Sequence, residues 1–196
     1  MSDLRSIGIF GGTFDPVHNG HVMVARAALE ELELDRLLIV PAAQSPFKSS
    51  PTLASAEARL TLLHAAFEDL AGCEVDGLEL DRQGVSYTIE TVRTVAKRYP
   101  DATLYCLIGA DHVATLKEWR EAEALAEAAI FVVVPRPGAP EEAFPKPFRG
   151  RYLKGDPLAI SASEIRQRLR AGRSVEDFVP PPVAQMLNSM QIYSEN

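Results

Sequence analysis

The sequence has only two cysteines and no long hydrophobic run. Cys73 and Cys106 both lie in apolar segments of strand-like composition, so we expect buried free thiols rather than a disulfide or a metal-binding pair. No apolar run approaches the roughly 18 residues that cross a bilayer, and the N-terminus lacks a basic region followed by a long apolar one. These absences predict a cytoplasmic protein that is not embedded in a membrane.

Basic residues are too few overall for a general binder of nucleic acid or of anionic membranes, because the formal net charge is −7. Their distribution is uneven. Between Phe144 and Arg173 there are eight basic residues and two acidic ones, which gives this segment a charge of +6 and leaves −13 for the rest of the chain. The cluster predicts an anionic ligand near the C-terminal third; the alternative is that these arginines only solvate a helix face.

Strand-like and helix-like segments alternate along the chain, whose length suits one well-buried core. We expect strands at Ser6–Phe10, Arg36–Val40, Cys73–Leu80, Thr103–Ile108, Ile130–Val134 and Arg151–Leu153. Helical spacing runs through Val22–Leu34, Ala54–Leu70, Ile89–Tyr99, Ser163–Ala171 and Val183–Met190. This alternation predicts an α/β fold, a parallel sheet with helices on both faces, in a single domain over residues 1–196.

The first expected strand runs directly into the segment "GGTFDPVHNGH". In a parallel sheet ligands collect at the carboxyl ends of the strands, and the backbone of Gly11 and Gly12 can approach a phosphate closely. His18 and His21 follow at the expected start of a helix, where a spacing of three places both side chains on one face. Two imidazoles here suit phosphate oxygens that gain charge in a transition state. The alternatives are a structural pair bonded to loop carbonyls and a zinc site, for which nearby ligands are lacking.

The stretch from Gly11 to His21 resembles the signature of the HxGH nucleotidyltransferases. The whole motif, "GGTFDPVHNGH", is similar to that of the nicotinate-nucleotide adenylyltransferases within this superfamily. The resemblance implies a Rossmann-like, doubly wound sheet and an enzyme that transfers an adenylyl group from ATP. It also implies that His18 and His21 stabilise the reacting phosphoryl group. The residues implied to bind ATP in this loop are Gly11, Gly12, Thr13 and Phe14.

The segment "ISASEIR", which ends at Arg166, is a second candidate phosphate site. Ser161 followed by Glu164 fits a capping box, and a helix start at Ser163 is the other option; either start presents helix N-terminal amides beside Arg166. A plain capped helix is the alternative. After the first motif, this segment resembles the family's second one. The resemblance implies that Ser161, Ser163 and Arg166 bind the β and γ phosphates, within a C-terminal helical part of about residues 155–196.

Two positions depart from the family's pattern. Ala162 stands where the family has a serine, and we expect phosphate binding to survive because an N-terminal hydroxyl and the arginine remain. In the segment "SPFK", Phe47 stands where the family usually has a histidine. Lys48 matches the lysine that approaches the phosphates, and the resemblance assigns it to the leaving pyrophosphate.

Three further segments, "SYTIETV", "LIGADHVATLKEW" and "VVVPRPG", resemble the family with less specificity. The resemblance implies that Thr88 lies near the carboxylate of a nicotinate ring and that Trp119 stacks on this ring; a core-packing tryptophan is the alternative. Asp111 follows an expected strand, where it would bond a ribose hydroxyl, position magnesium through water, or cap a helix. Glu90 replaces the family's usual aspartate.

The reaction implied by the resemblance is adenylyl transfer from ATP to nicotinic acid mononucleotide, giving nicotinic acid adenine dinucleotide and pyrophosphate in NAD biosynthesis. Mg²⁺ would accompany ATP and be held mainly through phosphate oxygens, so we expect no set of protein metal ligands. Two alternatives stay open: the same chemistry on nicotinamide mononucleotide or phosphopantetheine, and a nucleotide-binding module without catalysis. The expected partners are small-molecule nucleotides, with no nucleic acid and no membrane, and the sequence carries no signal for the oligomeric state.

Overall fold

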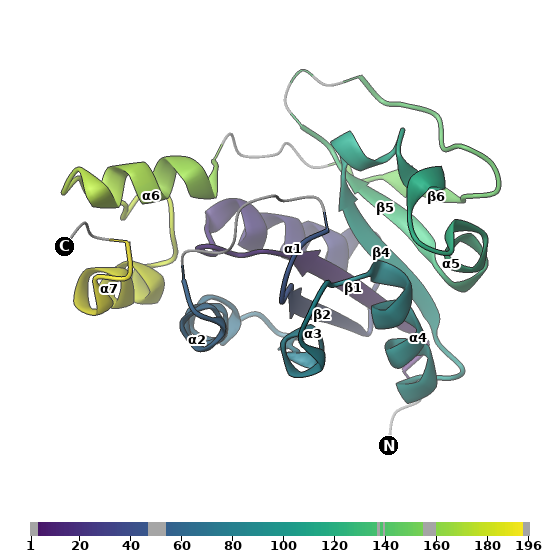
Figure 1. The fold of residues 1–196 in the computed structure, drawn as a ribbon, viewed down its shortest axis with the longest axis horizontal. Coiled ribbons are helices and arrows are strands. Elements are labelled where there is room, and N and C mark those ends of the chain that lie inside the picture. The colour runs from purple at the N-terminus through teal and green to yellow at the C-terminus, as the bar shows by residue number, and fades with distance from the viewer. Residues whose placement is uncertain (1–3, 47–53, 137, 139, 155–159, 194–196) are drawn as a thin grey trace.

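The computed structural model describes residues 4–46, 54–136, 138, 140–154 and 160–193 (Figure 1). Six strands form one parallel sheet in the order β3-β2-β1-β4-β5-β6. The strands are β1 (Ser6–Gly12), β2 (Arg36–Pro41), β3 (Cys73–Val75), β4 (Thr103–Gly109), β5 (Ile130–Val134) and β6 (Gly150–Tyr152). The helices are α1 (Asn19–Glu31), α2 (Ala56–Phe67), α3 (Leu78–Arg82), α4 (Thr88–Arg98), α5 (Ala122–Ala128), α6 (Ala162–Arg170) and α7 (Pro181–Met190). Two 3₁₀ turns, Ala110–His112 and Leu116–Glu118, lie between β4 and α5.

This strand order is that of a doubly wound, Rossmann-like sheet, so the expected fold class is confirmed. The chain adds β2 and β3 on one side of β1 and then returns to add β4, β5 and β6 on the other side. The order therefore reverses between β1 and β4. In open parallel sheets, ligands bind beyond the carboxyl ends of the strands at such a reversal.

The sheet is covered on both faces because alternate residues of each strand point to opposite sides. On β1, Ile7 and Ile9 enter one hydrophobic cluster and Phe10 enters the other. The cluster around Phe10 is closed by α1, α2, α6 and α7, and the cluster around Ile9 by α4 and α5. In Figure 1, α6 and α7 form the left end of the molecule beside α1 and α2. The C-terminal helices thus share a core with the start of the chain.

One expected strand is wrong in its second half. The segment Cys73–Leu80 forms a strand only as far as Val75, and α3 begins at Leu78. The side chain of Asp76 accepts a hydrogen bond from the Leu78 N–H at 3.0 Å, and this local turn ends the strand. Helix α5 had no counterpart among the expected elements. The other expected elements are present with ends shifted by up to three residues.

Both cysteines are free thiols, as expected. Cys106 is buried, whereas Cys73 is only half-buried. Burial raises the pKa of each thiol to about 12, so neither is a thiolate at neutral pH. We therefore assign neither thiol a nucleophilic role.

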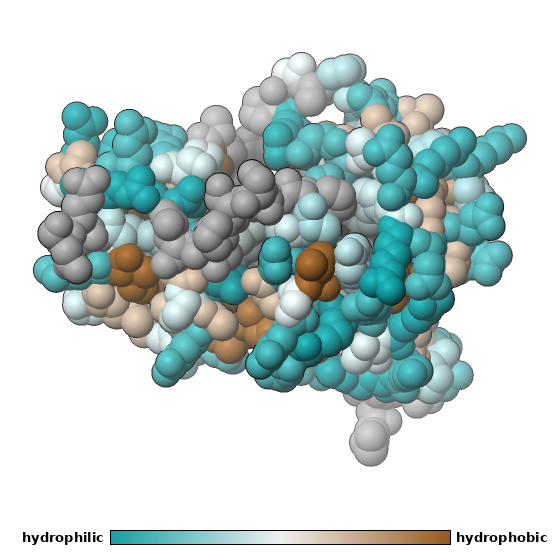
Figure 2. Space-filling model, viewed as in Figure 1, coloured by the Kyte–Doolittle hydropathy of each residue, from teal (hydrophilic) through white to brown (hydrophobic). Residues whose placement is uncertain are grey.

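Within the part of the chain that the structure describes, no helix has the length and apolar character needed to cross a membrane. The face of the molecule in Figure 2 is mainly hydrophilic, with hydrophobic residues in small separate spots. Met23 and Met190, each 44% exposed, are the large hydrophobic residues with high exposure among those described.

The loop between β1 and α1 is held from the C-terminal end of the chain. The hydroxyl of Tyr193 donates a hydrogen bond to Oδ1 of Asp15 at 2.6 Å, and the Ala54 N–H donates to the same oxygen at 3.1 Å. The Asn19 N–H, at the start of α1, donates to the carbonyl of Phe178 at 2.9 Å. The position of this loop therefore depends on residues more than 150 positions away.

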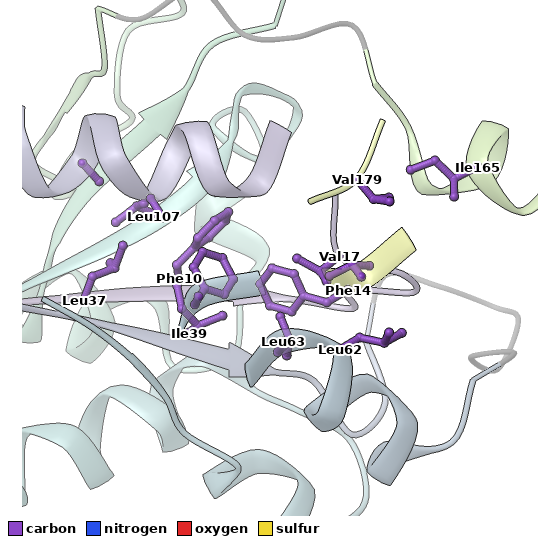
Figure 3. Packing of buried hydrophobic residues seen from close by; sticks show 14 of the residues in the cluster. Phe10, Phe14, Val17, Leu37, Ile39, Leu62, Leu63, Leu107, Ile165 and Val179 are labelled. Atoms are coloured by element: carbon purple, nitrogen blue, oxygen red, sulfur yellow. The ribbon is translucent and has the colours of Figure 1, made fainter. Parts of the chain in front are cut away.

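A buried arginine supports the same loop from α2. Arg59 is 2% exposed, and its Nη1 donates to the carbonyls of Thr13 and Ala42 at 2.9 and 2.8 Å. Burial lowers the pKa of Arg59, while the charge of Asp15 acts in the opposite direction. Figure 3 shows the apolar side of the same contact: Phe14 and Val17 of the loop lie beside Leu62 of α2. The loop is thus fixed by both polar and apolar contacts.

The hydrogen bond from Tyr193 should contribute measurably to stability. We expect Tyr193→Phe to lower the free energy of unfolding by about 1–3 kcal/mol, because the buried Asp15 carboxylate loses a donor. Urea unfolding would measure the change. Tyr105→Phe is the matched control, since the Tyr105 hydroxyl makes no hydrogen bond with a described residue, and it should change stability much less. Equal effects of the two substitutions would contradict the assignment.

Candidate functional site

A cavity of about 790 Å³ lies at the carboxyl ends of the central strands, where the strand order reverses. Its walls come from the ends of β1, β4 and β5 and from the first turns of α1, α4 and α6. The expected site residues that line it are Gly11, Gly12, Thr13, His18, His21, Thr88, Trp119, Ser161, Ser163 and Arg166. The structure thus brings together most of the residues that the two motifs and the acceptor segments identified.

The two histidines lie against each other at the start of α1. His18 immediately precedes the helix, His21 occupies its third position, and their rings stack with centroids 3.7 Å apart and planes inclined by 25°. The backbone N–H of His18 donates a hydrogen bond to Nδ1 of His21 at 3.1 Å. Since Nδ1 of His21 accepts this bond, Nε2 carries the proton in the neutral ring. His21 is therefore a hydrogen-bond donor through Nε2 on the cavity wall.

His18 is the more enclosed of the pair. It is 8% exposed, and its Nδ1 is buried with no hydrogen-bond partner among the described residues. Burial lowers its pKa from 6.5 to about 4. At neutral pH His18 is therefore uncharged in the absence of an anion.

Two glycines beside the histidines leave little room for a side chain. A Cβ on Gly20 would lie 3.0 Å from Nδ1 of His18, so a side chain there would press on the imidazole. A Cβ on Gly12 would lie 2.9 Å from the ring of Phe14. Phe14 itself does not line the cavity: it is 2% exposed and packs edge-on against His21 at a centroid distance of 4.9 Å. The structure places its side chain as support for the histidine, behind the surface that a ligand would touch.

The second motif approaches the first loop as expected. Ser161 is the N-cap of α6, and its hydroxyl accepts a hydrogen bond from the Glu164 N–H at 3.2 Å, which decides between the two expected helix starts. Arg166 reaches across to the first loop, where its Nη1 donates to the carbonyl of Asp15 at 2.7 Å. The amides at the start of α6, the Ser163 side chain and the Arg166 guanidinium therefore border the same cavity as the histidines.

Of two further expected site residues, one lies outside the described residues and the other lies outside the cavity lining. Lys48, with the neighbouring departure Phe47, lies outside the described residues. Asp111 does not line the cavity, and it forms an ion pair with Arg136 at 3.2 Å on the rim. The expected alternative of Asp111 as a helix N-cap is wrong, because Asp111 lies inside the 3₁₀ turn Ala110–His112, whose N-cap is Gly109.

The opposite end of the cavity is formed by α4 and by the segment after β4. Thr88 is the first residue of α4, so it stands among the unbonded amides of that helix N-terminus. The ring of Trp119 forms T-shaped contacts with His112 and Phe131, with centroid distances of 5.7 and 6.2 Å. Trp119 therefore packs on the core and also lines the cavity, so the two sequence-based alternatives are not exclusive.

Several residues of the site were missed by the sequence reasoning. Arg136 lines the cavity at the end of β5 and was present in the segment "VVVPRPG", without an assigned role. Glu79 and Thr91 also line the cavity. Glu79 lay in the part of the expected strand Cys73–Leu80 that forms helix α3 instead. Arg59 carried no local signal, since its partners are backbone carbonyls of distant loops.

The described residues contain no group of three or more histidine, cysteine, aspartate or glutamate side chains that could hold a metal ion. The donors at the histidine end of the cavity are imidazoles, hydroxyls, amides and a guanidinium. Mg²⁺ prefers oxygen ligands and is often held through substrate phosphates together with few protein groups. These hydrogen-bond donors suit the phosphate oxygens of a nucleotide, through which a magnesium ion would be held.

Comparison with known sequences assigns the family. The model of the cytidylyltransferase-like family matches residues 9–168. A probable nicotinate-nucleotide adenylyltransferase from Gemmatimonas aurantiaca is 42% identical over 196 residues, covering 96% of this chain and 92% of the relative. One from Thermus thermophilus is also 42% identical, over 187 residues, covering 95% of this chain and 98% of the relative.

Solved structures agree with the fold. A Plasmodium falciparum nicotinic acid mononucleotide adenylyltransferase, solved with NaAD, has a TM-score of 0.76 at 20% identity and covers 96% of this chain and 97% of its own. A putative nicotinate-nucleotide adenylyltransferase from Vibrio parahaemolyticus has a TM-score of 0.71 at 21% identity, covering 94% of this chain and 99% of its own. The chain belongs to the cytidylyltransferase-like family, on the branch of the nicotinate-nucleotide adenylyltransferases.

Proposed function

We propose that this protein transfers the adenylyl group of ATP to the phosphate of nicotinic acid mononucleotide, releasing pyrophosphate. The observation that carries the proposal is the meeting of the two stacked histidines and the N-terminus of α6 at one cavity, with Thr88 and Trp119 on its opposite side. The names of the relatives from Gemmatimonas aurantiaca and Thermus thermophilus support the same reaction.

The chemical step needs little proton transfer. The 5′-phosphate of the acceptor is already an anion at neutral pH, since its second pKa is about 6, so it attacks the α-phosphorus of ATP without a strong general base. Positioning and charge stabilisation then supply most of the catalysis. In this proposal Nε2–H of His21 donates to a non-bridging oxygen of the transferring phosphate, and the imidazole of His18 lies beside the same group.

The leaving pyrophosphate is assigned to the C-terminal motif. The α6 N-terminus presents amides and carries the positive end of the helix dipole, and the Ser163 side chain and Arg166 add donors of hydrogen bonds. Lys48 belongs to the same group in the proposal. Magnesium bound to the triphosphate would neutralise part of its charge. Asp111, which lies in the 3₁₀ turn after β4 and pairs with Arg136 on the rim of the cavity, is the carboxylate that we assign to this ion through water.

The acceptor's ring is assigned to the other side of the cavity. A planar pyridine ring can stack on the exposed part of Trp119. Its carboxylate would then meet the N-terminal amides of α4 and the hydroxyl of Thr88, which suit an anion. A nicotinamide ring lacks this charge, so the geometry favours the acid over the amide.

Pyrophosphate release separates this proposal from its alternatives. We expect the purified protein with Mg²⁺ and ATP to release pyrophosphate fastest with nicotinic acid mononucleotide, when nicotinamide mononucleotide and phosphopantetheine are tested in parallel. Faster release with another acceptor would support the adenylyl-transfer chemistry and refute nicotinic acid mononucleotide as the preferred substrate. ATP binding in calorimetry without release in any reaction would favour the non-catalytic nucleotide-binding module.

Removing the donor of His21 should slow the chemical step. We expect His21→Ala to lower kcat by about 10²- to 10³-fold, the usual cost of losing one electrostatic donor to the transition state. His21→Asn should lower kcat similarly, although its side-chain oxygen can still accept the hydrogen bond from the His18 N–H. His64→Asn on the exposed side of α2 is the control. Near-normal kcat in both His21 variants would exclude His21 from the chemical step.

Binding of ATP should be coupled to protonation of His18. The pKa of His18 is about 4 without ligand, so the ring is neutral at pH 6, and a neighbouring polyphosphate would raise this pKa. The complex then holds a proton that the free protein lacks, and ATP affinity falls as pH rises through the pKa of the complex. We expect uptake of up to about one proton per ATP at pH 6. Titration calorimetry in buffers of different ionisation enthalpy measures it, and His18→Asn should take up less; equal uptake would contradict the coupling.

A further inference from the structure

A buried carboxylate lines the cavity and has no role in the proposed reaction. Glu79 on α3 is 7% exposed, which is uncommon for a glutamate, and it forms part of the cavity wall. Its Oε1 accepts a hydrogen bond from the hydroxyl of Thr91 on α4 at 2.5 Å. Among the described residues this is the one hydrogen bond made to the Glu79 carboxylate. Oε2 therefore keeps its capacity to accept a hydrogen bond from a ligand.

Glu79 shares the cavity wall with Cys106 of the central strand β4. Its carboxylate is close enough to Cys106 for its charge to add to the burial that raises the pKa of that thiol. Cys106 on β4 pairs with Ile9 on β1, just before the strand ends that carry the first loop. Cys106 thus lies where β1 and β4 meet, with His21 after the end of β1 and Trp119 after the end of β4.

The chemistry of a carboxylate limits what it can bind here. A carboxylate only accepts hydrogen bonds and repels other anions. Nicotinic acid mononucleotide carries a phosphate at one end and a ring carboxylate at the other, and between them only the ribose hydroxyls are neutral hydrogen-bond donors. Both position and charge therefore match Glu79 to the middle of the acceptor. Carboxylates bind ribose hydroxyls in the same way in other doubly wound sheets.

We propose that Glu79 binds a ribose hydroxyl of the acceptor mononucleotide through Oε2, while Thr91 orients the carboxylate through Oε1. This inference rests on the proposed function, since it names a contact made by the proposed acceptor. It adds a specificity determinant to the site: the pocket selects a ribonucleotide and disfavours an acceptor without the sugar diol, such as phosphopantetheine.

The elements that carry Glu79 are linked to both sides of the acceptor pocket. The carboxylate of Glu90 on α4 pairs with Arg82 on α3 at 3.3 Å and with Arg120, next to Trp119, at 3.1 Å. The guanidinium of Arg120 also lies over the ring of Tyr87, 4.5 Å from its centroid. These partly exposed contacts hold α3 and the Trp119 segment against the start of α4. Glu79 is thus presented by the same structural unit as the ring-binding residues.

Acceptor analogues that lack one hydroxyl test the contact. Steady-state kinetics would compare nicotinic acid mononucleotide with its 2′-deoxy and 3′-deoxy forms, in the wild-type protein and in Glu79→Gln, whose amide oxygen can still accept the Thr91 hydrogen bond. We expect Glu79→Gln to raise KM for the full acceptor about 10-fold, because a charge-assisted hydrogen bond becomes a neutral one, with KM for ATP unchanged. With the analogue that lacks the bound hydroxyl, wild type and variant should be equal.

Two further variants make the result specific. Asp81→Asn removes an exposed carboxylate from the same helix and should leave both KM values unchanged. Thr91→Val should raise KM for the full acceptor about 3-fold, because it removes only the orienting hydroxyl. A loss in Glu79→Gln that is the same for all three acceptors, or that extends to ATP, would overturn the contact with ribose. Absence of turnover of nicotinic acid mononucleotide by the wild-type protein would instead refute the proposed function, and the inference with it.

Discussion

The hydrogen bond from Arg166 to the carbonyl of Asp15 is the contact on which the geometry of the site depends. It joins α6 to the first loop across 151 positions of sequence at a distance of 2.7 Å. A guanidinium has five N–H donors in a fixed plane, so one can hold the loop while others face the cavity. Moving α6 away would break this hydrogen bond and leave the Arg166 guanidinium and the partly buried Asp15 carbonyl unpaired, which costs free energy. The two candidate phosphate sites are therefore fixed relative to one another before any ligand binds.

Arg59 and Asp15 are buried charged residues that do not line the cavity, and both belong to the polar network that holds the loop between β1 and α1. Arg59 holds the carbonyls of Thr13 and Ala42, and Tyr193 with the Ala54 amide holds the carboxylate of Asp15. Apolar packing alone would let the loop that follows the two adjacent glycines adopt several conformations, whereas directional hydrogen bonds select one. Pre-organisation of this kind suits a reaction in which positioning supplies most of the rate.

Most of the fold and the two phosphate motifs could be predicted from sequence, because periodicity and capping residues act locally. The first strand, expected to end at Phe10 and observed to end at Gly12, is one example, and the cap at Ser161, one of the two expected helix starts, is another. Contacts between distant segments have no local signature, which is why Arg59 and Tyr193 were missed. Glu79 was missed for another reason: its apolar neighbours continued a strand pattern that Asp76 ends by turning the chain.

The charges of the described residues divide the cavity in a way that matches the proposed substrates. The phosphate end has Arg166, helix amides and two imidazoles, and the carboxylate among the lining residues is that of Glu79. Two rings stacked at 3.7 Å repel each other if both are protonated, and burial already keeps His18 neutral. Without a bound anion, burial therefore keeps this ring of the stacked pair uncharged. A polyphosphate bound beside His18 would raise the pKa of its imidazole and favour the charged form, so electrostatic stabilisation is strongest when the phosphates are in place.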